Sequence, residues 1–167
     1  MRTIANVFMF LLTFAIVSNI WADARERKEP ITDKGETIVA AFSSKFKVRV
    51  TIQTTRIPGR LPFVSEEELG SNTNPTVIKM ISITINGTPL FVSRSAFADL
   101  VDPREARISF QSKQVVLTVW GGDAADSYIM RLYFDRKAVW RRTLSSAIPP
   151  PVVTEETRYR LRTLRDD

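Results

Sequence analysis

The sequence predicts a mainly β protein, organised as a single antiparallel β-sandwich or a twisted meander sheet with one short helix. Three features of the sequence support this fold class. Apolar and polar residues alternate in several runs, as expected for strands that bury one face. Turn residues separate these runs at short intervals, and one short segment alone has a helical pattern.

The clearest strand is predicted over Lys45–Thr55. Its residues Phe46, Val48, Val50 and Ile52 fall on one face, and charged or hydroxyl residues occupy most of the other. Such alternation is typical of a sheet with one buried and one hydrated face. We therefore expect this strand to cover one side of the hydrophobic core.

A second strand and a tight turn are predicted over Val77–Ile85 and Asn86-Gly87. The alternation of apolar residues resumes in this strand and is interrupted by Lys79. Because Asn and Gly both tolerate positive φ, Asn86-Gly87 predicts a two-residue type I′ hairpin. The returning strand begins at Pro89, where a missing amide donor is tolerated.

The helical pattern is confined to Ser93–Leu100 and ends before Asp102-Pro103. Beyond it, short connections separate four more strand-like runs and favour a meander, in which consecutive strands are neighbours. These four predicted strands are Arg107–Phe110, Gln114–Trp120, Ser127–Asp135 and Ala138–Leu144. The residues of the first three runs that we expect to face the core are Ile108, Phe110, Val115, Leu117, Val119, Tyr128, Met130, Leu132 and Phe134.

The amino-terminal residues 1–24 have the pattern of a signal peptide. Arg2 precedes an apolar run over Val7–Ile20, and small residues stand at the −3 and −1 positions of a cleavage site at Ala22-Asp23-Ala24. The run is roughly 14 residues long, short of the roughly 20 that a membrane-spanning helix needs. We expect a periplasmic or secreted protein without a transmembrane segment after signal removal. An uncleaved membrane anchor is the alternative.

The rest of the chain divides into three segments. Residues 25–44 are expected to be a flexible leader with a brief strand or turn of helix near Thr37–Phe42. Residues 45–148 are the predicted β domain. Within it, the long connection Arg56–Pro75 is expected to be a solvated or disordered loop, or else a loop that binds a partner. Residues 149–167 are expected to form a proline-rich spacer and a C-terminal strand.

The C-terminal strand is predicted over Glu155–Arg165. Arg158, Arg160 and Arg162 alternate with less polar residues there, which indicates an edge strand with one arginine face. A helix capped by Thr154 is the alternative, because acidic residues come first and basic residues last.

The composition excludes several kinds of chemistry. The chain has no cysteine and no histidine, so disulfides, thiolate nucleophiles, histidine bases and the commonest metal ligands are absent. The carboxylates Asp99, Asp102, Asp123 and Asp126 do not match a known metal-binding spacing. We therefore expect a protein that is not an enzyme, with no cofactor and no metal. A carboxylate-dependent hydrolase is a less favoured alternative.

The remaining candidates for function are aromatic and arginine residues on the predicted strands, since Trp, Tyr and Arg dominate protein interfaces. Regular alternation would place Arg142 on the same strand face as Trp140 and Arg141 on the opposite face. Which of the two faces is exposed stays open. The candidate binding residues are Trp120, Arg131, Tyr133, Trp140, Arg141, Arg142, Arg158, Arg160 and Arg162.

The net charge indicates the kind of partner. At +6 and with a sequence pI near 10.0, the protein favours another protein with an acidic surface, or an anionic component of the envelope. Nucleic acid is not expected to be a partner of an exported protein. We expect an immunity or inhibitor protein that occludes a toxic or lytic envelope enzyme. A structural or assembly accessory of a bacterial envelope, binding by strand addition, is the alternative.

Overall fold

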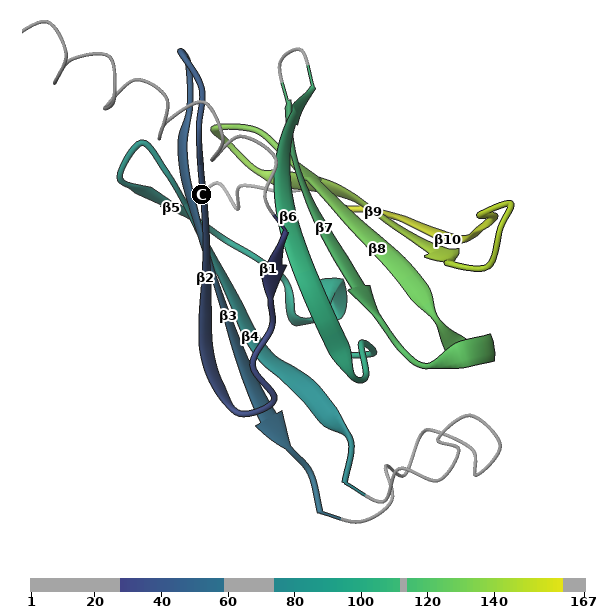
Figure 1. The fold of residues 1–167 in the computed structure, drawn as a ribbon. Coiled ribbons are helices and arrows are strands. Elements are labelled where there is room, and N and C mark those ends of the chain that lie inside the picture. Colours follow the sequence, from purple (N-terminus) through teal and green to yellow (C-terminus); the bar gives the residue numbers. More distant parts are fainter. Residues whose placement is uncertain (1–27, 59–73, 112–113, 161–167) are drawn as a thin grey trace, which may run out of the picture.

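The protein forms two antiparallel sheets that pack as a β-sandwich, in a computed structural model that describes residues 28–58, 74–111 and 114–160 (Figure 1). One sheet has six strands in the order β1-β6-β7-β8-β9-β10, and the other has four in the order β2-β3-β4-β5. The predicted antiparallel, mainly β fold is therefore confirmed. The strands are β1 (Glu29–Pro30), β2 (Gly35–Phe42), β3 (Lys47–Arg56), β4 (Thr76–Ile85), β5 (Thr88–Leu90), β6 (Pro103–Gln111), β7 (Gln114–Gly121), β8 (Tyr128–Phe134), β9 (Val139–Ser146) and β10 (Val153–Arg158).

Strands β6 to β9 form the predicted meander, because each pairs with the next in the chain, and β10 adds a fifth strand to it. Short turns make this order possible. At the turn between β8 and β9, one carboxylate oxygen of Asp135 accepts hydrogen bonds from the amides of Lys137 and Ala138, at 2.7 and 3.0 Å. This side chain supplies acceptors for amides that the ladder leaves unpaired.

The hairpin between β4 and β5 has the predicted geometry. Asn86 and Gly87 have φ values of 51° and 86°, and Ile85 pairs directly with Thr88 across the turn. The Asn86 side chain also accepts a hydrogen bond from the amide of Lys47, at 2.7 Å. The turn is thus tied to β3 as well as to its own two strands.

The interruption of the apolar pattern at Lys79 is a β-bulge. In the ladder between β3 and β4, Gln53 pairs with Met80 and Thr54 pairs with Ile78, so that Lys79 has no register partner. The extra residue shifts the alternation by one position. As a result, Ile78 and Ile81 are both buried although they are three residues apart.

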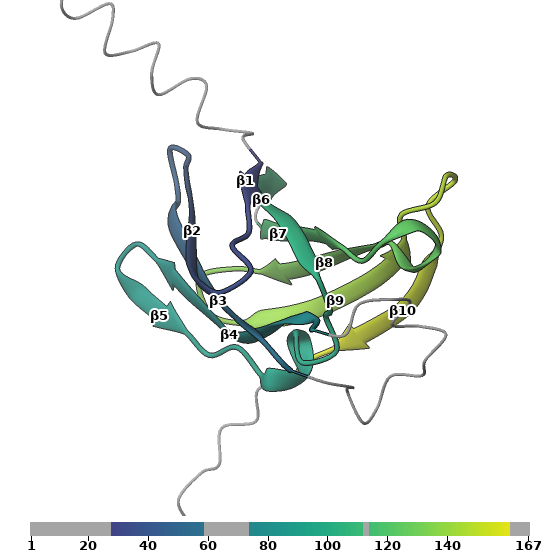
Figure 2. The same cartoon turned by 60° about the horizontal axis from the view of Figure 1, so that its bottom comes forward.

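The predicted leader, residues 25–44, contains two strands. Gly35–Phe42 pairs with β3 along its whole length, so this segment belongs to the four-stranded sheet. The short β1 pairs with β6 in the other sheet and precedes β2 in the chain. Figure 2 shows β1 between β2 and β6, where it connects one layer with the other. The described part of the β domain therefore begins well before residue 45.

The predicted helix over Ser93–Leu100 is reduced to a 3₁₀ turn, η1, at Arg94–Ala96. The Ser93 hydroxyl lies 2.9 Å from the Ser95 hydroxyl and does not cap the turn. Phe97 and Leu100 are nevertheless buried in the core, as their spacing predicted. Burial of these two side chains holds the segment in place, together with backbone hydrogen bonds such as that from the amide of Ala98 to the carbonyl of Arg94, at 3.0 Å.

The core lies between the sheets and contains residues of both. The predicted inward residues of β7 and those at 130, 132 and 134 of β8 are fully buried in it, and Phe110 and Tyr128 pack at its edge. No helix of the described residues is long and apolar enough to cross a membrane. The predicted signal peptide 1–24 and most of the connection 56–75 lie outside the residues that the structure describes.

Candidate interaction surface

The outer face of the six-stranded sheet carries most of the predicted binding residues. We define the outer face as the strand positions that point away from the core. Alternate residues of the same strands, such as Ile108, Leu117 and Leu132, belong to the core. The outer face consists of Glu105, Arg107 and Ser109 of β6, Val116, Thr118 and Trp120 of β7, Ile129, Arg131 and Tyr133 of β8, Trp140, Arg141, Thr143 and Ser145 of β9, and Glu156 and Arg158 of β10.

Short side chains form the floor of this face. Val116, Thr118, Thr143 and Ser145 are only 1–4% exposed, although none of them belongs to the core between the sheets. Their cross-strand neighbours include Arg131, Tyr133 and Arg107, which are long and half-buried. The long side chains lie over the short ones, so the face presents arginine and aromatic groups to the solvent.

A bulge in β9 places an aromatic and an arginine side by side. Tyr133 pairs with Arg141 and Phe134 pairs with Val139, so Trp140 is an extra residue without a register partner. The rings of Tyr133 and Trp140 have centroids 5.7 Å apart and are tilted by 46°. The Arg141 guanidinium carbon lies 4.9 Å from the centroid of the Tyr133 ring. We call these three residues the Tyr133 cluster.

A second aromatic group lies at the β1 side of the face. The Nζ atom of Lys28 lies 4.2 Å from the centroid of the Trp120 ring, and the Arg107 guanidinium carbon lies 5.5 Å from it. Lys28 also forms an ion pair of 2.7 Å with Glu105. Each such cation–ring contact is worth about 0.5–1 kcal/mol at an exposed site, so these contacts hold the cations near the ring.

Acidic residues lie at the two margins of the face. Glu105 is at the β6 side, and Glu156 of β10 accepts hydrogen bonds of 2.8 Å from both Arg141 and Arg158. The hydrogen bond from Arg158, with a further contribution from Arg141, keeps the pKa of Glu156 below its usual value. Arg107 and Arg131, between these margins, form no ion pair with any residue that the structure describes.

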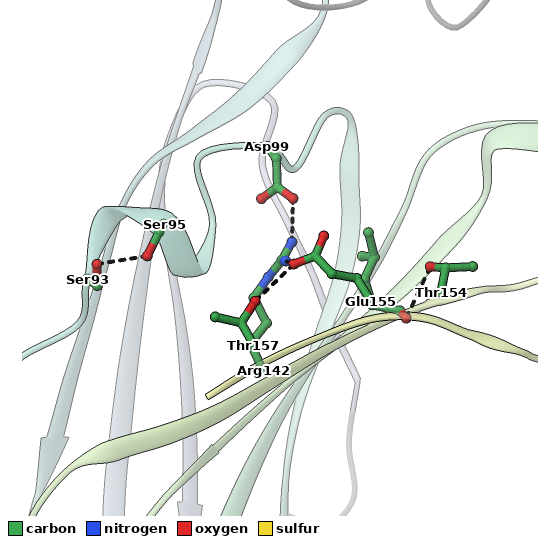
Figure 3. A network of polar contacts seen from close by, with 8 residues as sticks. Ser93, Ser95, Asp99, Arg142, Thr154, Glu155 and Thr157 are labelled. Atoms are coloured by element: carbon green, nitrogen blue, oxygen red, sulfur yellow. Dashed lines mark hydrogen bonds and ion pairs between the residues drawn. The ribbon is translucent and has the colours of Figure 1, made fainter. Parts of the chain in front are cut away.

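Arg142 does not belong to the outer face. It pairs with the core residue Leu132 across the strands and is only 1% exposed. Figure 3 shows its guanidinium between Asp99 and Glu155, with donor–acceptor distances of 2.5 and 2.6 Å. The expectation that Arg142 shares a face with Trp140 was therefore wrong, because the bulge at Trp140 inverts the alternation that follows it.

The structure thus brings together six of the nine predicted binding residues on one face. Arg160 is exposed but follows the end of β10, and Arg162 lies outside the described residues. Lys28, Glu105, Arg107 and Glu156 were not predicted. For Arg107, the available signal was its position two residues after Glu105 in an alternating strand, on the face opposite Ile108.

Three of the four candidate carboxylates, Asp99, Asp102 and Asp123, have structural partners. Asp99 binds Arg142, and Asp102 accepts a hydrogen bond of 2.7 Å from the amide of Thr76. Asp123 caps the 3₁₀ turn η2 (Ala124–Asp126) and pairs with Arg104 at 2.9 Å. In the part of the chain that the structure describes, no three Asp or Glu residues are grouped so that they could hold a metal ion.

Comparisons with protein-family models, with curated proteins and with solved structures found no match. The candidate surface is therefore interpreted from its own geometry and charge.

Proposed function

We propose that this protein is a small exported binding protein that captures an acidic protein with the outer face of its six-stranded sheet. The partner that fits best is a toxic or lytic enzyme of the envelope, and the protein acts on it as an immunity protein or inhibitor. It acts by covering the partner's cleft at a ratio of one to one and needs no chemistry of its own.

The Tyr133 cluster is the observation that carries this proposal. Tyr, Trp and Arg are the residue types that contribute most binding energy at protein interfaces. Here the three side chains already contact one another, with 5.7 Å between the Tyr133 and Trp140 rings and the Arg141 guanidinium over Tyr133. Less conformational entropy is lost when side chains that are already ordered enter an interface.

The charge of the face supports an acidic partner. Lys28, Arg107, Arg131, Arg141 and Arg158 contribute positive charge, and Glu105 and Glu156 are the acidic residues of the described part of the face. Cations in such excess raise the rate at which a negatively charged protein associates. They also repel basic proteins, which adds selectivity.

The experiment begins with capture of the partner from the envelope fraction of the source cells by the immobilised mature protein. The captured enzyme is then purified, and its activity is titrated with the free protein. We expect activity to disappear at one equivalent. We also expect Tyr133→Ala/Trp140→Ala to weaken inhibition at least a hundredfold, because hot-spot truncations cost about 2 kcal/mol or more each.

Phe91→Ala is the matched control, since Phe91 is an exposed aromatic residue outside the outer face. This variant should inhibit as well as the wild type. Full inhibition by Tyr133→Ala/Trp140→Ala, or failure of any captured enzyme to lose activity, would contradict the proposal.

Strand addition at β10 is a second candidate because of one observation. β10 is the last strand of its sheet and pairs only with β9 among the described residues. Such an edge can accept a strand from another protein, as an assembly accessory of the envelope would require.

A further inference from the structure

We propose that Arg107 and Arg131, with Thr118 between them, form the site at which the outer face receives the carboxylates of a short acidic segment of the partner protein. The inference rests on the proposed function, because it specifies which part of the captured protein this site binds. We call these three residues the central arginine site.

The strand register brings the two arginines into one row. Arg107 pairs with Thr118 across β6 and β7, and Thr118 pairs with Arg131 across β7 and β8. Neighbouring strands are about 4.8 Å apart, so the two arginine backbones are about 10 Å apart. Two side chains of arginine length can both reach a group that lies over Thr118, which is only 4% exposed and adds no bulk between them.

The distribution of charge distinguishes this row from the rest of the face. Lys28 pairs with Glu105, and Arg141 and Arg158 share the single carboxylate of Glu156. Arg107 and Arg131 have no such partner among the described residues. Two of the three positive charges that these ion pairs leave uncompensated therefore lie in the centre of the face.

The two arginines are also partly desolvated, and Arg107 is partly ordered, before an anion binds. Both are half-buried, and the Nε atom of Arg107 is buried without a hydrogen-bond partner. Part of the desolvation cost of binding has therefore been met during folding. Contact with the Trp120 ring restricts the Arg107 guanidinium, which leaves less conformational entropy to lose. An arriving carboxylate can then form the short, paired hydrogen bonds that guanidinium groups make.

The short extent of the central arginine site favours a short acidic segment over a long anionic polymer. Along the row, Arg131 is followed by Thr143 and then by Glu156. Arg141 and Arg158 already bind this carboxylate, so the row offers an anion only the two unpaired guanidinium groups, about 10 Å apart, and a long charged polymer finds no further cation along it. A few carboxylates on a protein surface fit between the margins, and the neighbouring rings of the Tyr133 cluster can pack against apolar groups around them.

The test uses the full mature chain and three probes: a capped peptide of six glutamates, inorganic phosphate and a sulfated hexasaccharide. Binding is measured by calorimetry at low and at moderate salt. We expect the peptide to bind most tightly, and Arg107→Gln/Arg131→Gln to weaken its binding at least tenfold. The effect should shrink at the higher salt concentration, because exposed charges are screened.

The matched control is Arg56→Gln/Arg104→Gln, which removes the same charge from residues outside the outer face that pair with Asp33 and Asp123. It should leave peptide binding within twofold of the wild type. Equal weakening by both double variants would mean that net charge alone attracts the peptide. Tighter binding of the hexasaccharide or of phosphate than of the peptide would also overturn the inference. Thermal unfolding of each variant confirms that the fold is retained.

The same variants separate this inference from the proposed function. If Arg107→Gln/Arg131→Gln still inhibits the captured enzyme and Tyr133→Ala/Trp140→Ala does not, the inference about the central arginine site is contradicted and the proposed function stands. Inhibition that survives both double variants would contradict the proposed function itself.

Discussion

The guanidinium of Arg142 on β9 donates a hydrogen bond of 2.5 Å to Asp99, which follows η1, and so fixes the edge of one sheet to the loop that leads to the next strand. A second bond of 2.6 Å joins Arg142 to Glu155 of β10 (Figure 3). The Arg142 side chain is 2% exposed, whereas those of Asp99 and Glu155 are 49% and 48% exposed. The cost of removing charge from water is therefore borne mainly by the Arg142 guanidinium and less by the two carboxylates.

This asymmetry predicts which substitution destabilises the fold most. Asp99→Asn/Glu155→Gln leaves Arg142 buried without a counter-charge and should lower the free energy of unfolding by about 3–5 kcal/mol. Arg142→Met removes the buried charge and leaves two acids that water can reach. It should cost less, because replacing a buried ion pair by an apolar side chain is often near neutral.

Urea unfolding of the wild type and both variants measures these differences. Arg141→Met is the control, because it makes the same substitution at the adjacent position, which lies on the outer face. A greater loss in Arg142→Met than in the double variant would show that the ion pairs are not what stabilises this edge.

A buried tyrosine predicts a loss of stability at alkaline pH. Burial, and then the negative charges of Asp102 and Asp99, raise the pKa of Tyr128 above its usual value near 10. Above that pH the unfolded chain releases the phenol proton while the folded protein keeps it. The free energy of unfolding should therefore fall as pH rises beyond about 10.

Tyr128→Phe removes the ionisable group and with it this contribution. The Tyr128 hydroxyl has no hydrogen-bond partner in the described part of the protein, so the variant should be as stable as the wild type at pH 7, or more stable by about 1 kcal/mol. At pH 11 the free energy of unfolding of Tyr128→Phe should exceed that of the wild type by more than it does at pH 7. Urea unfolding at both values gives the comparison, and an unchanged difference would contradict the expectation.

Alternation along the chain was sufficient to predict the sheet class, the Asn86-Gly87 turn and most inward residues, because each depends on local backbone geometry. It was not sufficient at bulges, where one inserted residue inverts every later position. The bulge at Trp140 had a signal in the sequence. Val139 and Leu144 are both apolar but five residues apart, and regular alternation would place them on opposite faces of the strand. The register that joins Arg107 to Arg131 depends on pairing between strands and is not readable from one strand.

One backbone amide at the free edge of β10 allows an experiment to distinguish the two candidate functions. The amide of Tyr159 donates to the carbonyl of Trp140 at 3.0 Å, and donors alternate along an antiparallel strand. The amide of Arg158 therefore points away from β9, where an added strand would bind it. Arg158→Pro removes this donor without removing a bond to β9, and extended backbone accommodates the φ of proline.

If the protein acts by strand addition, Arg158→Pro should reduce partner binding at least tenfold, whereas Arg158→Ala should bind like the wild type because it keeps the amide. If the outer face captures the partner, the two variants should bind alike, since both lose only a side chain at the margin of that face. Calorimetry with the captured partner distinguishes these outcomes. Because proline and alanine remove the same guanidinium, any difference between the two variants is assigned to the backbone and not to charge.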